Sequence, residues 1–304
     1  MKDYLEFSNM NDALKHYTNE ILEQDIVVSK NSKNLDTYRK SLIELHPIFF
    51  KLNNPQKVLF NLPDYKCLPY WYAGEILTEM LGLNPPLMTN YRSDIIDWSY
   101  DLLESGRACY GYGCRWLNHN SLEKTYKKLK ENPTSKRCYV PIFDQNDVGD
   151  TLDAPCNLGF LLLERDNKLD LSLFTRSIDI TKGFRYDFSL FSFIQQSMTS
   201  WLNKDTGNLF YFCNSLHCYG QDIDKIKKLQ QYFKNNEPKE NLELIIDKNM
   251  EIRKTYDDLR KIVELENVIR HKQYSDLNTE INKLNYNFSK EFINIFIRKN
   301  ETMP

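Results

Sequence analysis

Three strongly apolar segments in the middle of the chain do most to limit how it can fold. They lie at residues 137–143 (RCYVPIF), 157–164 (NLGFLLLE) and 168–177 (KLDLSLFTRS). Each is too short for a buried helix, and polar turn residues such as those at 164–167 (ERDN) separate them. Residues 208–220 (NLFYFCNSLHCYG) predict another strand, after a helical pattern at 188–202. We therefore expect a core built around a sheet.

Helical periodicity dominates both flanks of this segment. Residues 1–135 are expected to be mostly helical, with apolar residues three to four apart at 14–22 and 76–81, and residues 84–86 (NPP) end the second helix. Residues 221–304 are charged and helical. Their apolar stripes comprise Leu259, Ile262, Val263 and Ile269 in one, and Leu277, Ile281, Leu284, Phe288, Phe292 and Ile295 in the other. The expected fold class is α+β.

Charge and composition exclude several classes of protein. In 304 residues, 40 Lys and Arg nearly balance 42 Asp and Glu, whereas nucleic-acid-binding proteins usually carry a basic excess. The apolar run at 158–163 is far shorter than a membrane span, and the first residues, MKDYLEFSNMND, contain no apolar signal core. We expect a cytoplasmic protein that binds neither nucleic acid nor membrane.

The seven cysteines predict neither a disulfide framework nor a metal site. Their number is odd, no CxxC pair occurs, and the spacings of Cys109 with Cys114 and of Cys213 with Cys218 match no standard zinc pattern. Reduced thiols and no bound metal are expected.

Reactive and charged side chains gather at the ends of the predicted central strands. Cys156 follows Pro155 at a strand entrance, and Arg176, Ser177 and Asp179 follow the end of another strand. A cysteine at a strand entrance is most often a core residue, and an Arg–Asp motif is most often a surface salt bridge. Neither motif alone assigns a function.

In their order along the chain, these residues resemble thymidylate synthase and its relatives, which transfer one-carbon units to C5 of pyrimidine nucleotides. The resemblance covers about residues 70–220 and rests on Glu75-Ile76-Leu77 with Gly82, Trp98, Tyr112-Gly113-x-x-Trp116, Ser135-Lys136-Arg137, Pro155-Cys156, Arg176-Ser177-x-Asp179, Gly183-x-x-x-Asp187 and His217-x-Tyr219. It implies a large mixed sheet flanked by helices. Residues 1–245 would form the catalytic domain and residues 246–304 a helical C-terminal extension.

The resemblance also implies how the reaction proceeds. Cys156 would add to C6 of the pyrimidine, which makes C5 nucleophilic. Because a free thiol has a pKa of about 8.5, it needs nearby positive charge, which Arg176 would supply while binding the nucleotide phosphate. Glu75 would be the general acid and base, and 5,10-methylenetetrahydrofolate the one-carbon donor.

The remaining roles implied by the resemblance concern binding. Ser177, His217 and Tyr219 would contact phosphate and sugar, Tyr112 would line the pocket beside Cys156, and Asp179, Trp98 and Glu75 would contact the folate. Lys136 and Arg137 match cations that reach the phosphate from a partner subunit. The resemblance therefore implies a symmetric homodimer with shared active sites.

Asp187 bears on the choice of substrate. Thymidylate synthase has an Asn here, whose amide offers one donor and one acceptor to uracil, whereas relatives that act on dCMP have an Asp. An ionised carboxylate accepts only, so it suits the 4-amino group of cytosine and favours a proton on N3. Asp187 therefore predicts dCMP as substrate, although a helix N-cap would also explain an Asp at this position.

Several positions depart from the family pattern. Asn157 replaces the usual His, Thr175 replaces Gln, and a helical extension stands where the family has a Pro-His-Pro segment and a short apolar tail. Without that tail, water can capture the intermediate and give a 5-hydroxymethyl product. We therefore predict a dCMP 5-hydroxymethyltransferase. The alternatives are a divergent thymidylate synthase methylating dUMP, a CMP hydroxymethylase, and a non-catalytic nucleotide-binding homologue.

Overall fold

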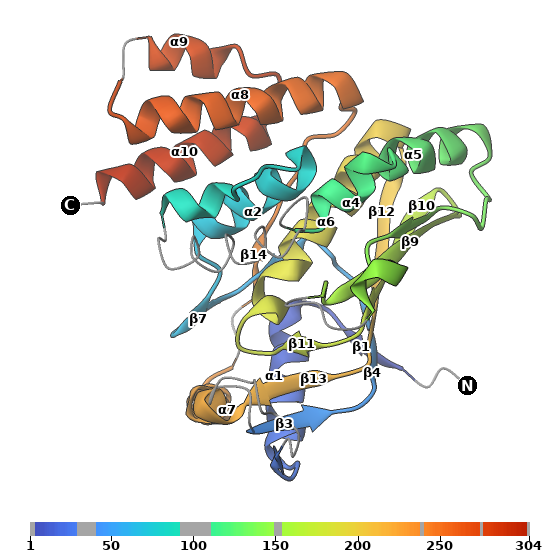
Figure 1. The fold of residues 1–304 in the computed structure, drawn as a ribbon, viewed down its shortest axis with the longest axis vertical. Coiled ribbons are helices and arrows are strands. Elements are labelled where there is room, and N and C mark those ends of the chain that lie inside the picture. Colours follow the sequence, from blue (N-terminus) through green and yellow to red (C-terminus); the bar gives the residue numbers. More distant parts are fainter. Residues whose placement is uncertain are drawn as a thin grey trace.

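A six-stranded mixed sheet forms the centre of the computed structural model, which describes residues 4–28, 41–91, 111–148, 154–237, 240–273 and 276–302. Its strand order is β1–β4–β12–β10–β9–β8 (Figure 1). The strands are β1 (Leu5–Phe7), β4 (Ile48–Leu52), β8 (Tyr139–Pro141), β9 (Asn157–Arg165), β10 (Lys168–Thr175) and β12 (Asp205–Cys213). The predicted strands at 137–143, 157–164 and 168–177 are therefore confirmed as β8, β9 and β10.

The hairpin of β9 and β10 brings two candidate site segments together at its open end. Thr175 pairs with Asn157, and the N–H of Arg176 donates to the carbonyl of Cys156 at 2.9 Å. β10 and β12 are parallel, and α6 (Gly183–Leu202) forms the crossover between them. The antiparallel register therefore fixes where the cysteine and the arginine lie relative to each other.

The helix α6 covers one face of this sheet and carries Asp187 near its start. The ring of Phe188 lies 4.9 Å from that of Tyr211, and the ring of Phe191 lies 5.5 Å from that of Phe160. All four rings are fully buried. This aromatic packing holds the start of α6 over the open end of the hairpin.

A second sheet has the order β11–β13–β3–β2 and consists of β11 (Ile178–Asp179), β13 (Leu216–Tyr219), β3 (Ser41–Leu45) and β2 (Val27–Val28). The prediction of a single strand over 208–220 is wrong, because the chain changes sheets between β12 and β13. Asn214 donates its N–H to the carbonyl of Thr175, and the carbonyl of Ser215 accepts from Ile178. These bonds turn the chain out of the first sheet.

The expectation that residues 1–135 are mostly helical is wrong between residues 41 and 66. Besides β3 and β4, this segment forms β5 (Lys57–Leu59), β6 (Asn61–Leu62) and β7 (Tyr65–Lys66), and β5 pairs with β14 (Leu242–Glu243). Strands of two to five residues are too short to show a period. The predicted helices α1 (Met10–Leu22) and α2 (Pro69–Leu81) are confirmed, and α2 ends at Gly82, which has a φ of 63°.

The remaining helical elements lie around the sheets. They are η2 (Leu87–Asn90), α4 (Gly113–Asn118), α5 (Ser121–Glu131), η3 (Gln145–Asp147), η4 (Gly220–Asp222), α7 (Ile223–Asn235), α8 (Ile252–Arg270), α9 (Leu277–Asn282) and α10 (Asn287–Glu301). The last apolar stripe is split between α9 and α10. At this break, the carboxylate of Asp258 accepts the backbone N–H groups of Asn285 and Tyr286.

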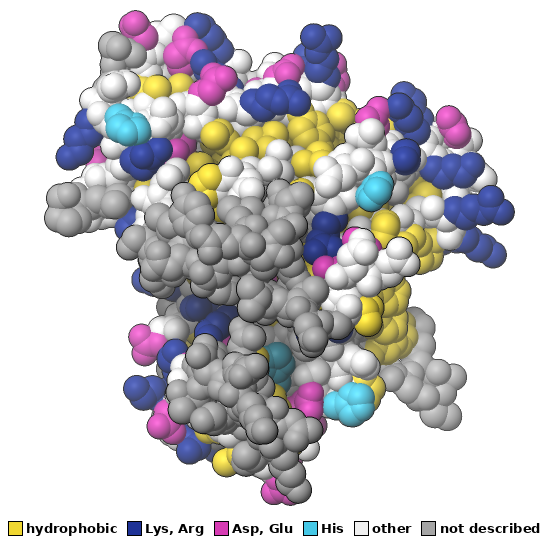
Figure 2. Space-filling model, viewed as in Figure 1, with side chains coloured by type: hydrophobic (Ala, Val, Ile, Leu, Met, Phe, Trp, Pro, Cys, Tyr) yellow, Lys and Arg dark blue, Asp and Glu magenta, His cyan; other side chains and the backbone are white. Residues whose placement is uncertain are grey.

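The C-terminal helices α8 and α10 pack against α2, and α9 packs against α10 (Figure 1). Tyr91, which follows η2, donates its hydroxyl to Glu266 of α8 at 2.8 Å, and Asn300 of α10 donates to the same hydroxyl at 3.3 Å. Lys and Arg side chains alternate with Asp and Glu over their outer surface (Figure 2). In the described ranges, no helix combines the length and the apolar character needed to span a bilayer.

Candidate active site

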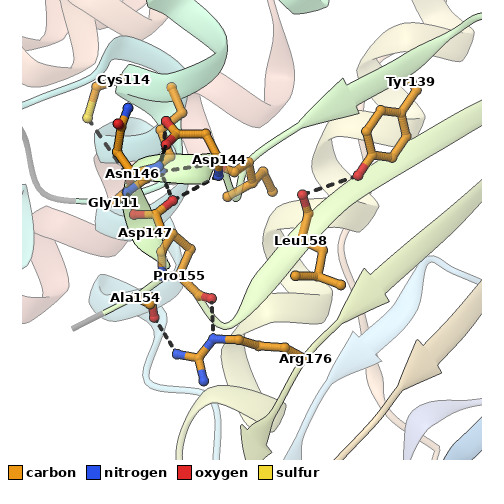
Figure 3. Close-up of polar contacts among 12 residues, drawn as sticks. Gly111, Cys114, Tyr139, Asp144, Asn146, Asp147, Ala154, Pro155, Leu158 and Arg176 are labelled. Atoms are coloured by element: carbon orange, nitrogen blue, oxygen red, sulfur yellow. Dashed lines mark hydrogen bonds and ion pairs between the residues drawn. The ribbon is translucent and has the colours of Figure 1, made fainter. Parts of the chain in front are cut away.

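The site is built first from the open end of the β9–β10 hairpin, where Arg176 anchors the segment before Cys156. Its Nε donates to the carbonyl of Pro155 at 2.8 Å, and its Nη2 donates to that of Ala154 at 2.6 Å (Figure 3). Its Nη1 donates to Ser177 Oγ at 2.9 Å. A guanidinium has five N–H groups, so two remain to bind an anion beyond these contacts within the described residues. Cys156 beside it is half-buried and is not part of a disulfide.

Asp187 faces this hairpin from α6 and is 4% exposed. Its Oδ2 accepts from Asn157 Nδ2 at 2.7 Å, and Asn157 Oδ1 accepts from Thr175 Oγ1 at 2.6 Å. Burial raises the pKa of Asp187 to about 7, although the hydrogen bond from Asn157 lowers it. Because α6 begins at Gly183, the alternative that Asp187 is a helix N-cap is wrong.

Two carboxyl groups of α2 face Asp187. Burial, and then the charges of Asp187 and Glu79, hold the pKa of Glu75 well above its usual range. Glu75 Oε2 is buried and has no hydrogen-bond partner among the described residues. An acid with a raised pKa and an unused oxygen can exchange a proton with a bound molecule.

Glu79 is a site residue that the sequence analysis missed. Burial raises its pKa to about 8, while the backbone N–H groups of Gly113 and Tyr112, which donate to its carboxyl, lower it. A Cβ added at Gly113 would lie 1.9 Å from the Glu79 carbonyl oxygen, so only glycine fits there. The signal available in the sequence was a second Glu four residues after Glu75 in an otherwise apolar helix.

Tyr112 lies at the centre of these groups. Its ring stacks on Phe191 with centroids 6.3 Å apart. Burial, and then the charges of Asp187, Cys156, Glu79 and Glu75, hold its pKa well above its usual range. The structure therefore brings together four residues that the sequence predicted: Glu75, Tyr112, Cys156 and Asp187.

The second sheet contributes Asp179 and His217, which pair in adjacent strands. Asp179 Oδ1 accepts both the N–H and the hydroxyl of Thr181 at 2.7 Å, and burial raises its pKa to about 6. Its Oδ2 is buried without a hydrogen-bond partner in the described ranges, although Lys182 Nζ lies 3.8 Å away. An unused buried acceptor fits the N–H donors of a pterin ring.

His217 is neutral at neutral pH, because burial lowers its pKa and the charge of Arg176 lowers it further. Its ring packs edge-on against Tyr219, with centroids 4.9 Å apart. A neutral imidazole beside a phenol offers both a donor and an acceptor to a hydroxyl group of a ligand.

Lys136 and Arg137 do not join this cluster within one chain. Both are exposed, and the carbonyl of the next residue, Cys138, accepts from the N–H of Leu162. Leu162 lies six residues along β9 from Cys156, which is roughly 20 Å of strand. Trp98, the other predicted folate contact, lies outside the described residues.

The cysteines differ from expectation at one position. Cys114 is disulfide-bonded, so the prediction that all thiols are reduced is wrong there, whereas Cys67, Cys138, Cys156, Cys213 and Cys218 are not part of a disulfide. An odd number of cysteines argues against a framework of several disulfides, but it does not exclude a single disulfide. Across the described residues, no group of His, Cys, Asp and Glu side chains has the arrangement of a metal site.

A separate hollow of about 490 Å³ lies between α5 and α8. Its aromatic lining includes Tyr126, Trp201 and Tyr256, and Figure 2 shows hydrophobic side chains gathered in this region. It contains none of the predicted site residues.

Comparison with known proteins gave matches over much of the chain. A family model described as thymidylate synthase matches residues 90–276, more than half of the chain. A deoxyuridylate hydroxymethyltransferase of Bacillus phage SP01 is 26% identical over 249 residues, which cover 74% of this chain and 64% of the relative.

Two further relatives are described as thymidylate synthases. The protein of Mycoplasma genitalium is 28% identical over 119 residues, covering 38% of this chain and 42% of the relative. That of Listeria innocua is 23% identical over 176 residues, covering 52% and 56%. The chain spans less than two thirds of the length of each of these three relatives. Glu75 precedes the range matched by the family model.

Proposed function

The chain belongs to the thymidylate synthase family, and on that premise we propose that it is a pyrimidine nucleotide C5 one-carbon transferase, specifically a dCMP 5-hydroxymethyltransferase. The single observation that supports this most is the convergence of Cys156, Glu75 and Asp187 on Tyr112. It provides a nucleophile, a neutral acid and a group that can bind the edge of a base within one buried site.

Cys156 adds to C6 of the pyrimidine as a thiolate, and the added electron density makes C5 nucleophilic. Arg176 stabilises the thiolate through its positive charge and holds the loop before it in place. Glu75 has a raised pKa and an unused oxygen, so it donates or accepts protons near the transferred carbon. Tyr112 excludes water from one side of the thiol.

Arg176, Ser177, His217 and Tyr219 bind the nucleotide. The two remaining N–H groups of Arg176 suit a phosphate dianion, because charged bidentate hydrogen bonds are the strong ones. His217 and Tyr219 lie next to each other and offer polar atoms to the sugar. The proximity of His217 to Arg176 supports placing sugar and phosphate side by side.

Enzymes of this family use 5,10-methylenetetrahydrofolate as the one-carbon donor. Bound to this chain, it would supply the carbon that joins C5. Asp179 would hold it through its unused oxygen, and Glu75 would lie beside it, with Trp98 as a further contact. Thr181 donates only to Oδ1 of Asp179, which leaves Oδ2 available for the folate.

The choice of base depends on Asp187. An ionised carboxylate accepts from the 4-amino group of cytosine and favours a proton on N3, which supports dCMP. A specific observation favours dUMP as the second candidate. Because burial raises the pKa of Asp187 to about 7, a neutral carboxyl is available, and it offers a donor to O4 and an acceptor to N3–H of uracil. The phage relative is also named for deoxyuridylate.

A homodimer with shared sites would explain the exposed pair Lys136 and Arg137, which lies too far from Cys156 to act within its own chain. The sheet face opposite α6 offers a surface for such a dimer, because half-buried aromatic rings and one exposed ring, that of Tyr139, form a row across it. The row consists of Tyr4, Phe49, Phe212, Phe174 and Tyr139, with neighbouring centroids 4.1 to 6.5 Å apart. Such a face is typical of an interface.

Release of tritium from C5 tests the proposal. The protein is incubated with methylenetetrahydrofolate and either [5-³H]dCMP or [5-³H]dUMP. Mass spectrometry then identifies the group that has been added to the product. Release from dCMP with a hydroxymethyl product is expected, and Cys156→Ser is the control. Release from dUMP alone would transfer the assignment to the second candidate, and release from neither would refute one-carbon transfer to both deoxynucleotides.

A further inference from the structure

We propose that Asn157 and Thr175 form a hydrogen-bond chain that positions Asp187 and so determines which pyrimidine the site accepts. This inference rests on the proposed function and goes beyond it, because neither residue matches the family pattern at its position. Both would be positioning residues, since they act on the base through Asp187.

The hydrogen-bond chain links three buried side chains, and each donates to the next, from Thr175 through Asn157 to Asp187. The Thr175 hydroxyl donates to Asn157 Oδ1 at 2.6 Å, and Asn157 Nδ2 donates to Asp187 Oδ2 at 2.7 Å. Asn157 is 0% exposed, and Thr175 is 3% exposed. Thr175 and Asn157 are also paired across β9 and β10, so the backbone fixes the spacing of the first two members. In this arrangement Oδ2 of Asp187 is an acceptor.

That arrangement matters because a neutral carboxyl has two forms. With the proton on the oxygen facing N3 it matches cytosine, and with the proton on the oxygen facing position 4 it matches uracil. A donor that occupies Oδ2 leaves Oδ1 as the oxygen that can carry a proton. Reversing the Asn157 amide would require the proton on Oδ2 and would present the opposite pattern to the base.

The other groups around Asp187 cannot replace this control. Titratable groups whose charges interact with it are Glu75 and Glu79 on α2, Tyr112 before α4, and Tyr211 and Cys213 on β12. All are acids that are neutral or anionic. The hydrogen bond from Asn157 is the one contact that lowers the pKa of Asp187 in the described part of the chain.

The experiment measures the ratio of kcat/KM for dCMP to that for dUMP in four proteins: wild type, Asn157→Leu, Thr175→Val and Thr175→Ser. Losing a hydrogen bond to a carboxyl is worth about a ten- to hundredfold change in an equilibrium. We therefore expect Asn157→Leu to bring the ratio toward one by about that factor. Thr175→Val should reduce it less, because Asn157 stays but can turn over. Thr175→Ser keeps the hydroxyl and should keep the ratio.

A pH profile separates positioning from general damage to the fold. Asn157→Leu removes a donor that favours the ionised carboxylate, so the pH midpoint of kcat/KM that reports Asp187 should rise by about one unit or more. Circular dichroism and thermal unfolding verify that the variants fold. If Asn157→Leu does not fold, the near-isosteric Thr175→Val, which lacks the hydroxyl, can still be compared with Thr175→Ser, which keeps it.

The outcomes distinguish this inference from the proposed function. Wild-type protein that releases tritium from neither nucleotide refutes the function itself. If the wild type is selective but the folded variants keep its kcat/KM ratio and pH midpoint, the hydrogen-bond chain does not set the selectivity. The proposed function would then stand and this inference would be refuted. An active wild type that does not discriminate between dCMP and dUMP would also refute the role of the hydrogen-bond chain, since there would be no preference for it to set.

Discussion

Replacing Glu79 by Gln should make the protein more stable at pH 8 and leave its stability at pH 5 nearly unchanged. Glu79 is 4% exposed, and its carboxyl accepts the N–H of Gly113. Gln has the same shape as the protonated acid and keeps one acceptor oxygen, so the local packing is preserved. What the substitution removes is the proton that Glu79 loses on unfolding.

The magnitude follows from the pKa. Folding raises the pKa of Glu79 from 4.5 to about 8, chiefly through burial. A raised carboxyl pKa means that the native state binds more protons than the unfolded state, so stability falls as pH rises from about 4.5 to about 8. At 1.36 kcal/mol per pKa unit, the wild type should lose at most about 4 kcal/mol through Glu79 between pH 5 and pH 8. The Gln variant should lose none of this.

Urea unfolding at pH 5, 6.5 and 8 measures the effect. Glu266→Gln is a matched control, because Glu266 is 1% exposed but pairs with Arg270 at 3.1 Å. Breaking that pair should lower stability at pH 8, which is the opposite sign. If Glu79→Gln shows the wild-type loss between pH 5 and pH 8, or is less stable than wild type at pH 8, the buried carboxyl is not protonated as argued.

Three further predictions concern catalysis, assembly and the C-terminal helices. Cys156→Ser should lower tritium release by about a thousandfold or more while the Kd for the nucleotide, measured by calorimetry, changes little, because a hydroxyl is a far weaker nucleophile than a thiolate. Phe212→Lys places a charge in the aromatic row on the open sheet face and should convert dimers to monomers in analytical ultracentrifugation; a dimer that persists would contradict the proposed interface. Asp258→Ala leaves the N–H groups of Asn285 and Tyr286 without their acceptor and should lower the free energy of unfolding in urea by about 2–4 kcal/mol, whereas a loss below about 0.5 kcal/mol would show that water replaces the carboxylate.

The sequence was sufficient to predict elements long enough to show a period. The strands β9 and β10 and the helices α1, α2 and α6 carry eight or more residues each and were predicted. Strands such as β5 and β6, with three and two residues, were missed because their pairing partners are set by tertiary contacts. The break between β12 and β13 was missed for the same reason, since the bond from Asn214 to Thr175 joins residues far apart in sequence.

The candidate site was predictable where the chemistry shows in residue type. A thiol, a guanidinium and a carboxyl in a familiar order identified Cys156, Arg176 and Asp187. Glu79 was missed because its importance comes from burial and from the backbone N–H groups of another segment, which a linear pattern does not contain. The role of Asn157 was likewise hidden, since its two hydrogen bonds reach residues 18 and 30 positions away.

The ease with which Cys156 forms a thiolate depends on the protonation of the carboxyl groups near it. Arg176 binds the segment just before Cys156, and the carboxyls of Glu75, Glu79 and Asp187 interact with the neighbouring Tyr112. If all three carboxyls were ionised, their combined charge would oppose a thiolate and offset the guanidinium. Burial raises the pKa of all three carboxyls, to about 7 for Asp187 and about 8 for Glu79, so that opposing charge is reduced near neutral pH. Under the proposed mechanism, the same burial that destabilises the fold at high pH would therefore let a nucleophilic cysteine work beside three carboxyl groups.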